Sequence, residues 1–134
     1  MAAKKIYELE VYELDIHPYG DKITLLIGDD KQINDYLDDK CPQISDRARP
    51  RVLENGGSHH GMHIRIYVDE SLIWLTEKSL HSFNHEVLHA VIWIMERCSI
   101  PIQSDYSEAF VCLYCDTIKR FKEMMQNKGR KFVE

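Results

Sequence analysis

One segment, His85-Glu86-Val87-Leu88-His89, constrains the fold of this chain more than any other. On a helix, residues four positions apart lie on one face, one turn above each other. Two imidazoles spaced in this way can bind one metal ion from two corners of a tetrahedron, while Glu86 can reach a water on that ion rather than the ion itself. The segment therefore predicts a helix that carries a metal site.

The residues around this segment predict the helix that the metal site needs. Apolar residues recur close to the 3.6-residue period, and the run ends near Cys98-Ser99, before Pro101. We expect the helix to cover residues 78 to 97, with the two histidines in its middle. The alternative is a helix with two ordinary histidines, one of them half-buried. The apolar positions of this pattern are Trp74, Leu75, Leu80, Phe83, Val87, Leu88, Val91, Ile92, Ile94 and Met95.

A second helical pattern follows after a short break. Ser104 or Asp105 is its expected N-cap, and Asn127-Lys128-Gly129 is its expected end. Because the connection between the two patterns is short, we expect the two helices to be antiparallel neighbours. The apolar positions of the second pattern are Ala109, Phe110, Val111, Leu113, Tyr114, Ile118, Phe121, Met124 and Met125.

Glu108, in the first turn of the second helix, is the candidate for a third metal ligand. Catalytic zinc usually has three protein ligands and a water, so two histidines alone would make a weak site. Glu108 follows His89 by nineteen residues, and it can converge on the same metal if the two helices cross at an angle. The alternative is a capping box, because Asp105-x-x-Glu108 has that form. If Glu108 is only a cap, Asp105 is the next candidate ligand.

This arrangement resembles the zincin peptidases of the gluzincin type, in which H-E-x-x-H on one helix is joined by a glutamate from a following helix. The resemblance implies that His85, His89 and Glu108 bind one Zn²⁺ per chain and that Glu86 is the catalytic general base. The segment N-H-E-V-L-H-A-V-I-W-I, followed by S-E-A-F-V-C-L-Y, is also similar to small metallopeptidase-like proteins encoded by phages and prophages. The specific resemblance covers residues 79 to 121.

Two cysteines follow Glu108 on the same helix face, at Cys112 and Cys115. Many gluzincins carry a carboxylate at the position of Cys112, where it orients one of the histidine ligands. We expect both cysteines to be small buried residues that let the helices pack closely. A thiolate near the metal and a redox pair are the alternatives.

The N-terminal half predicts strands and one short helix. Residues 6–16 alternate apolar and polar, His17 to Asp21 has turn chemistry, and residues 23–27 form a second strand, which together predict a hairpin. Gly28-Asp29-Asp30 supplies the cap of a short helix that ends near Lys40. A second hairpin is expected from residues 51–54 and 62–68, around a long loop over 55–61. The expected fold is therefore α+β: a small N-terminal antiparallel sheet with a short helix, then two long antiparallel helices that carry the metal site. Residues 1–134 are expected to form one domain, and the resemblance implies a minimal zincin-like build.

The strand over residues 62–68 bears on the mechanism. Its alternation puts His63, Arg65 and Tyr67 on one face. In zincins an edge strand before the motif helix often pairs with the extended substrate, so the resemblance implies the same role here; the alternative is an interior strand. A peptidase also needs a donor for the oxyanion of the transition state. Four residues are candidates for that donor: Tyr106, Tyr114, Tyr67 and His63.

Composition excludes several classes of protein. The net charge is −5 and the pI about 5.8, and no basic cluster is large enough to indicate a nucleic-acid footprint. The N-terminus has no apolar stretch of a signal peptide, and no run approaches the roughly 18 apolar residues of a membrane span. We therefore expect a cytoplasmic protein, in a cell or an infected host, with no nucleic-acid or membrane partner. The oligomeric state stays open.

The function expected from these features is zinc-dependent hydrolysis of peptide bonds in a peptide or protein substrate, by a metal-activated water with Glu86 as general base. The first alternative is a catalytically silent zinc-binding protein of the same fold that acts as a phage-related interaction or assembly module. Two further alternatives are a regulatory peptidase that cuts a repressor and an amide hydrolase with a non-protein substrate.

Overall fold

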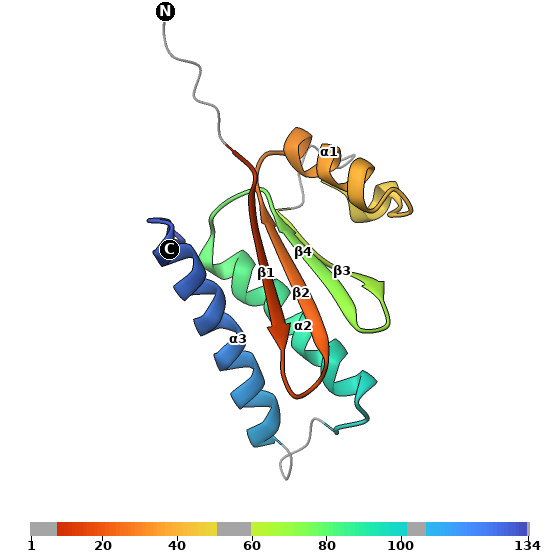
Figure 1. The fold of residues 1–134 in the computed structure, drawn as a ribbon, viewed down its shortest axis with the longest axis vertical. Coiled ribbons are helices and arrows are strands. Elements are labelled where there is room, and N and C mark those ends of the chain that lie inside the picture. The colour runs from red at the N-terminus through yellow and green to blue at the C-terminus, as the bar shows by residue number, and fades with distance from the viewer. Residues whose placement is uncertain (1–7, 51–59, 102–106, 134) are drawn as a thin grey trace, which may run out of the picture.

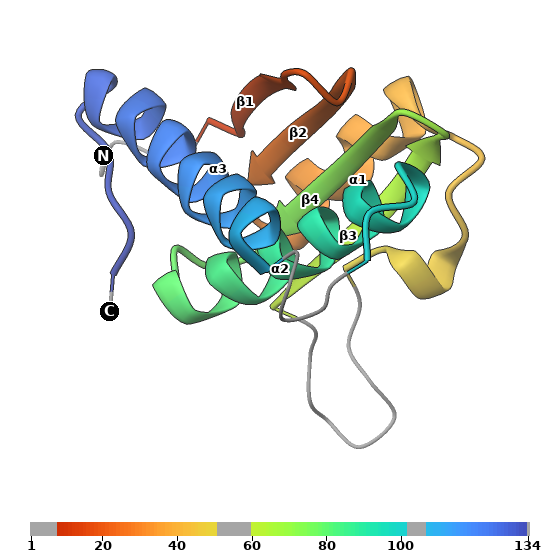
Figure 2. The same ribbon diagram turned by 90° about the horizontal axis from the view of Figure 1, so that it is seen from below.

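The protein has an α+β fold built on one four-stranded sheet (Figure 1). The computed structural model describes residues 8–50, 60–101 and 107–133. In chain order the elements are β1 (Glu10–Ile16), β2 (Asp21–Ile27), α1 (Asp30–Lys40), a short 3₁₀ turn (Asp46–Ala48), β3 (Gly61–Tyr67), β4 (Glu70–Leu75), α2 (Leu80–Arg97) and α3 (Ser107–Asn127). Figure 2 shows α1 behind the sheet, with α2 and α3 in front of it.

The sheet is mixed rather than antiparallel, which corrects the sequence-based prediction. The strand order is β1-β2-β4-β3, and the inner pair β2 and β4 runs parallel. The β1–β2 hairpin is antiparallel as predicted. The partner of β3 is β4, again antiparallel, and residues 51–54, the predicted partner, lie outside the described residues. A parallel pair needs a crossover of a dozen or more residues, which the chain from α1 through β3 supplies.

Strand β4 is the element that the sequence pattern misses. Its residues Trp74 and Leu75 match the apolar periodicity of the following helix, but they form a strand whose last five residues are all buried. A strand covered on both faces is a continuous apolar run without alternation, and periodicity cannot separate such a run from a buried helix segment. The apolar run before the motif helix therefore belongs to the sheet.

Alternate residues of the strands fill two separate cores. On one face, Ile23, Leu25, Ile73 and Leu75 pack against α2 and α3. On the other face, Leu26, Leu72 and Trp74 pack against α1 through Ile33 and Leu37. Successive side chains of a strand point to opposite faces, so one inner strand serves both cores. The motif helix α2 therefore lies on one face of a sheet that is covered on both faces.

The helix boundaries agree closely with the predicted ones. Asp29 caps α1 in a capping box with Gln32. Helix α2 begins two residues later than predicted, with Ser79 as its N-cap, and ends at Arg97 as predicted. Helix α3 ends at Asn127, and Gly129 follows with a φ of +69°, a conformation that glycine adopts readily. The predicted N-caps of α3, Ser104 and Asp105, lie outside the described residues.

Both ends of α2 are tied to buried carboxylates of the β1–β2 hairpin. At its start, Lys78 Nζ lies 2.6 Å from Glu10 Oε2, and Glu10 is 7% exposed. At its end, Arg97 forms an ion pair with Asp21 and donates a hydrogen bond to the Tyr19 carbonyl. A buried carboxylate needs a charged partner, so these pairs are strongly preferred over any arrangement that separates them. They fix the axial position of the helix that carries the motif.

The C-terminal segment adds a third restraint on α2. The Leu80 amide donates to the Val133 carbonyl over 3.0 Å, which satisfies one of the free N–H groups of the first helical turn. Phe132 stacks on Phe83 with ring centroids 4.3 Å apart, and Phe121 of α3 meets Phe83 edge-on at 6.1 Å.

Among the helices that the structure describes, none is long and apolar enough to cross a bilayer.

Candidate metal centre

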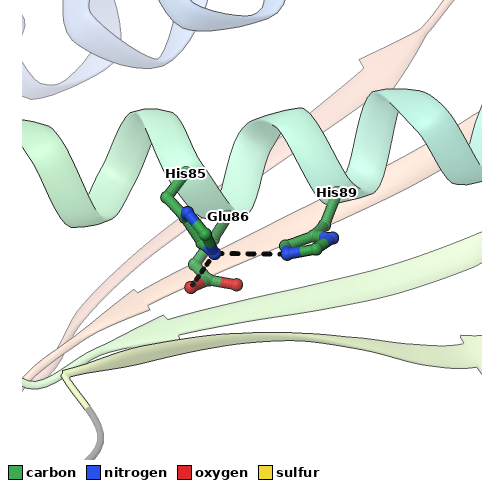
Figure 3. Close-up of side chains that lie close together, drawn as sticks. All are labelled: His85, Glu86 and His89. Atoms are coloured by element: carbon green, nitrogen blue, oxygen red, sulfur yellow. Dashed lines mark hydrogen bonds and ion pairs between the residues drawn. The ribbon is translucent and has the colours of Figure 1, made fainter.

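Helix α2 divides its side chains between the core and the side next to β3. Its buried face consists of Phe83, Glu86, Val87, Ala90, Val91, Ile94 and Met95. His85 and His89 are one helical turn apart and exposed, and the His85 side chain is 58% exposed. Figure 3 shows His85, Glu86 and His89 projecting from the same side of α2, towards β3. The periodic apolar pattern thus places both imidazoles at the edge of the core, where a metal ion from solvent can reach them.

The three motif side chains come together as the spacing predicts. The Nε2 atoms of His85 and His89 lie 3.2 Å apart, and their ring centroids are separated by 4.9 Å. His85 Nε2 lies 4.0 Å from Glu86 Oε2. One ligand atom from each residue lies within 4.8 Å of the others. Glu86 is 9% exposed, so its carboxylate sits at the mouth of a largely water-excluded environment.

The separation of the two imidazole nitrogens fits a tetrahedral zinc ion. With Zn–N bonds of about 2.0–2.1 Å, two ligands at the corners of a tetrahedron have nitrogens about 3.3 Å apart. The 3.2 Å between the Nε2 atoms matches this spacing. Two imidazoles and a nearby carboxylate are also the donor types that zinc accepts most readily. The residues present therefore fit the ion.

Gly61, which the sequence places in a loop, is the first residue of β3 and packs under Glu86. A Cβ atom built on Gly61 would lie 3.3 Å from Glu86 Cγ, 3.3 Å from the Trp74 carbonyl and 2.7 Å from Leu75 Cδ2. A contact of 2.7 Å forces a neighbour to move, because side chains in close-packed interiors have little free space. A side chain at residue 61 would therefore displace Leu75 most and would shift Glu86 by a few tenths of an ångström.

The variant Gly61→Ala is expected to displace Glu86 without removing the histidines. We expect the free energy of unfolding to fall by about 1–3 kcal/mol, the usual cost of overpacking a core. Zinc content should be unchanged, while any hydrolytic rate that depends on Glu86 should fall by about tenfold or more, since a small misplacement of a catalytic group is costly. Denaturant titration, elemental analysis and kinetics on the same preparation measure the three effects. Gly20→Ala, at a turn with no atom within 4 Å of the added Cβ, is the control for the rate. Because Gly20 has a φ of +75°, this change should also lower the free energy of unfolding, but it should leave the hydrolytic rate unchanged.

His63 lies on β3 close to His89. Its Nε2 atom is buried and has no hydrogen-bond partner in the parts of the chain that the structure describes. Burial, and next the neighbouring His89, lower the pKa of His63 to about 4. The ring is therefore neutral near pH 7 and carries one N–H donor and one acceptor nitrogen.

The three tyrosine candidates are placed less favourably. Tyr67, at the last position of β3, is 61% exposed. The Tyr114 hydroxyl donates to the Asn84 carbonyl over 3.4 Å. Tyr106 lies outside the described residues. Of the three oxyanion candidates that the structure describes, His63 is the one whose pKa is lowered by a histidine of the pair, His89.

Glu108 is in the first turn of α3, as predicted, but does not join the group formed by the motif. Its side chain is exposed, and its Oε1 accepts a hydrogen bond from Cys112 Sγ over 3.3 Å. Figure 3 shows α3 on the far side of α2 from the motif side chains. The ligand role and the capping role of Glu108 both stay predictions, and Asp105, needed for the cap, lies outside the described residues.

The prediction that Cys112 and Cys115 are buried is wrong, because both are exposed free thiols. The buried face of α3 is made instead by Leu113, Thr117, Phe121 and Met125, spaced four residues apart, and the cysteines lie beside this row. The hydrogen bond to the Glu108 carboxylate raises the pKa of Cys112 above its usual value. Its thiol is therefore held in the protonated form, which is a poor metal ligand and a poor nucleophile.

The site thus consists of two imidazoles at zinc-ligand spacing, a carboxylate beside a glycine, and a half-buried neutral imidazole on the neighbouring strand. The imidazole pair and the carboxylate come from α2, and the glycine and the third imidazole come from β3. Pairing within the sheet holds β3 in place, and the ion pairs at its two ends hold α2. Comparison of the chain with protein-family models, with curated proteins and with solved structures finds no match.

Proposed function

We propose that this protein is a zinc-dependent metallopeptidase of zincin-like build, in which Glu86 is the general base for hydrolysis of a peptide bond. The observation that carries the proposal is the pair of Nε2 atoms of His85 and His89 at 3.2 Å, with the Glu86 carboxylate 4.0 Å from the first of them. A structural pair of surface histidines would not require a buried carboxylate beside it, because burying an acid is costly.

Three residues would hold the single zinc ion: His85, His89 and Glu108. The two imidazoles already have the spacing of ligands. Glu108 would be recruited from α3 and would give up its hydrogen bond to the Cys112 thiol, which is a weak donor. Because α3 lies on the far side of α2 from the motif side chains, this recruitment would also require the start of α3 to move. A carboxylate as third ligand would also offset part of the charge of the ion.

In hydrolysis the zinc would supply Lewis acidity, which lowers the pKa of a water molecule towards neutrality and polarises the scissile carbonyl. Glu86 would accept the proton of that water and then pass it to the leaving amine. The missing side chain at Gly61 leaves room beside β3 for the Glu86 side chain, whose Cγ would lie 3.3 Å from an added Cβ. The two roles of Glu86 need one carboxylate that faces both water and substrate, which fits a side chain that is mostly but not fully buried.

His63 is the preferred candidate for stabilising the oxyanion that forms on the substrate. It is near His89, its Nε2 atom has no partner among the described residues, and it belongs to the strand beside the motif. A donor already held in position costs no reorganisation when charge develops on the substrate, which is why preorganised donors contribute strongly to catalysis.

The substrate would lie in extended form along β3. Among the strands that the structure describes, β3 is at an edge of the sheet, as predicted. An edge strand leaves a row of backbone donors and acceptors that a peptide can complete by adding one more strand. A peptide bound there would pass in front of the motif, because β3 runs beside α2 (Figure 1).

The metal content of untagged protein tests the proposal. We expect about one zinc per chain in the wild type, and loss or marked weakening of zinc binding in Glu108→Ala, since catalytic zinc usually needs three protein ligands. Elemental analysis after gel filtration measures the ratio, and Glu123→Ala, on the same helix and away from the motif, is the control. No zinc in the wild type, even after zinc is added, would reduce H-E-x-x-H to a coincidence. Bound zinc without cleavage of any peptide would favour a catalytically silent zinc-binding module.

A further inference from the structure

Beyond the motif, the interface of β3 and α2 contains a cation that is stacked on an aromatic ring. The guanidinium carbon of Arg65 lies 4.1 Å from the centroid of the Trp93 ring. Trp93 follows His89 by four residues and therefore lies on the same side of α2. Arg65 follows His63 by two residues and therefore lies on the same face of β3. The stacked pair continues the site along both elements.

Strand β3 and helix α2 advance by similar distances from Gly61 to Arg65. Two residues of a strand advance about 6.6 Å and four residues of a helix about 6 Å, so alternate β3 residues meet successive turns of α2. Gly61 meets Glu86, and His63 lies near His89. The Arg65 guanidinium is then about one helical turn beyond His89 along the interface of strand and helix. In an extended peptide this length corresponds to about two residues.

The charge of Arg65 is not neutralised in the parts of the chain that the structure describes. The residue is exposed, and no described carboxylate lies within ion-pair distance of it. Stacking on an indole uses the flat face of a guanidinium and leaves its N–H edge free. That edge matches a carboxylate through two parallel hydrogen bonds, which an ammonium group cannot form. Trp93 would thus hold Arg65 in an orientation suited to recognising a carboxylate.

We propose that Arg65 determines specificity by binding a carboxylate of the substrate, within about two residues of the position that faces the metal ligands. This inference rests on the proposed function, because it takes the free edge of β3 to be the peptide site. The carboxylate can come from an acidic side chain or from the free C-terminus of a peptide, since both present the same two oxygens.

Binding of peptides to the zinc-loaded Glu86→Gln protein tests this inference, because affinity is then measured without turnover. The probes are four forms of one extended peptide. The peptide carries either a glutamate or a glutamine at one position, and each of these two sequences has either a free or an amidated C-terminus. With Arg65 present, we expect calorimetry to show roughly three- to tenfold tighter binding of the form that carries the recognised carboxylate, as for a partly exposed ion pair. Dependence on the glutamate assigns the side chain, and dependence on the free C-terminus assigns the α-carboxylate.

Variants of Arg65 separate its role from a general effect of charge. Arg65→Gln should abolish the preference, Arg65→Glu should reverse it in favour of a peptide with lysine at the same position, and Trp93→Leu should weaken it. Lys119→Gln, a charge removal on α3, should leave it unchanged. Raising the salt concentration should also reduce the preference, because exposed charges are screened.

The outcomes distinguish this inference from the peptidase proposal. Equal affinity for all four peptides, no binding of any of them, or an unchanged preference in Arg65→Gln would overturn the role of Arg65. If the zinc-loaded wild type cleaves peptides without such a preference, the peptidase proposal stands and the role of Arg65 fails. If peptides bind with an Arg65-dependent preference and are not cleaved, Arg65 recognises carboxylates and the peptidase proposal fails.

Discussion

Glu86→Gln is expected to keep its zinc and to lose peptide hydrolysis. Glutamine has nearly the shape of glutamate, so it can occupy the same space beside Gly61 and leave the histidine pair undisturbed. Its amide cannot accept a proton from water, and a positioned general base contributes about 10²–10⁴-fold to a rate. We therefore expect kcat to fall by at least about 10²-fold, with an unchanged ratio of zinc to protein.

The measurement compares turnover of one peptide substrate by wild type and variant, each with its zinc content determined by elemental analysis. Glu96→Gln is the matched control, because Glu96 is an exposed glutamate on the same helix. Its activity should equal that of the wild type. Full activity in Glu86→Gln would rule out the mechanism, whereas loss of zinc in that variant would show that Glu86 contributes to the metal site itself.

The motif helix was predictable because two independent signals agree on it. The apolar positions of α2 recur at the helical period, and His85 and His89 are spaced so that only a helical turn brings them together. Five of the seven buried positions of α2 belong to that apolar set, and the other two are Glu86 and Ala90. Local periodicity therefore fixes which side of a helix is covered, and with it the side on which the imidazoles emerge.

The sheet order was not predictable from the same kind of signal. Strand β4 is buried on both faces, so its residues show no alternation. Trp74 and Leu75 happen to lie at positions that continue the helical periodicity of α2. Recognition of β4 as an inner strand would have required pairing information, because its parallel neighbour β2 is distant in sequence, although its other neighbour β3 directly precedes it. The same limit explains Gly61, which the sequence assigns to a loop and the structure to the start of an edge strand.

The environment of the site depends on contacts between elements, which a single sequence does not encode locally. The closeness of His63 to His89 and of Arg65 to Trp93 follows from the register of β3 against α2. The contact between Glu108 and Cys112 is local instead, because the two residues are one turn apart on α3. Their hydrogen bond forms within that helix and needs no other element. The ligand set is therefore predictable where it lies on one helix and uncertain where a second helix must contribute.

His85→Ala and His89→Ala are expected to abolish stable zinc binding, because each variant leaves a single imidazole where two nitrogens now stand 3.2 Å apart. A metal that binds only the folded state stabilises it by RT ln(1 + [L]/Kd), or about 2.7 kcal/mol at a free metal concentration of 100 times Kd. Chelation should therefore lower the melting temperature of the wild type by several degrees. It should leave the melting temperature of either variant unchanged.

His81→Ala is the control that makes this result specific. His81 is exposed on the same helix, one turn before His85, so its removal changes the histidine content of the same face without touching the pair. Its zinc content and its response to chelation should equal those of the wild type. Equal loss of zinc in His81→Ala would move the site one turn towards the helix start, to His81 and His85. Wild-type affinity in both His85→Ala and His89→Ala would place any bound zinc elsewhere and remove the basis for Glu86 as a catalytic base.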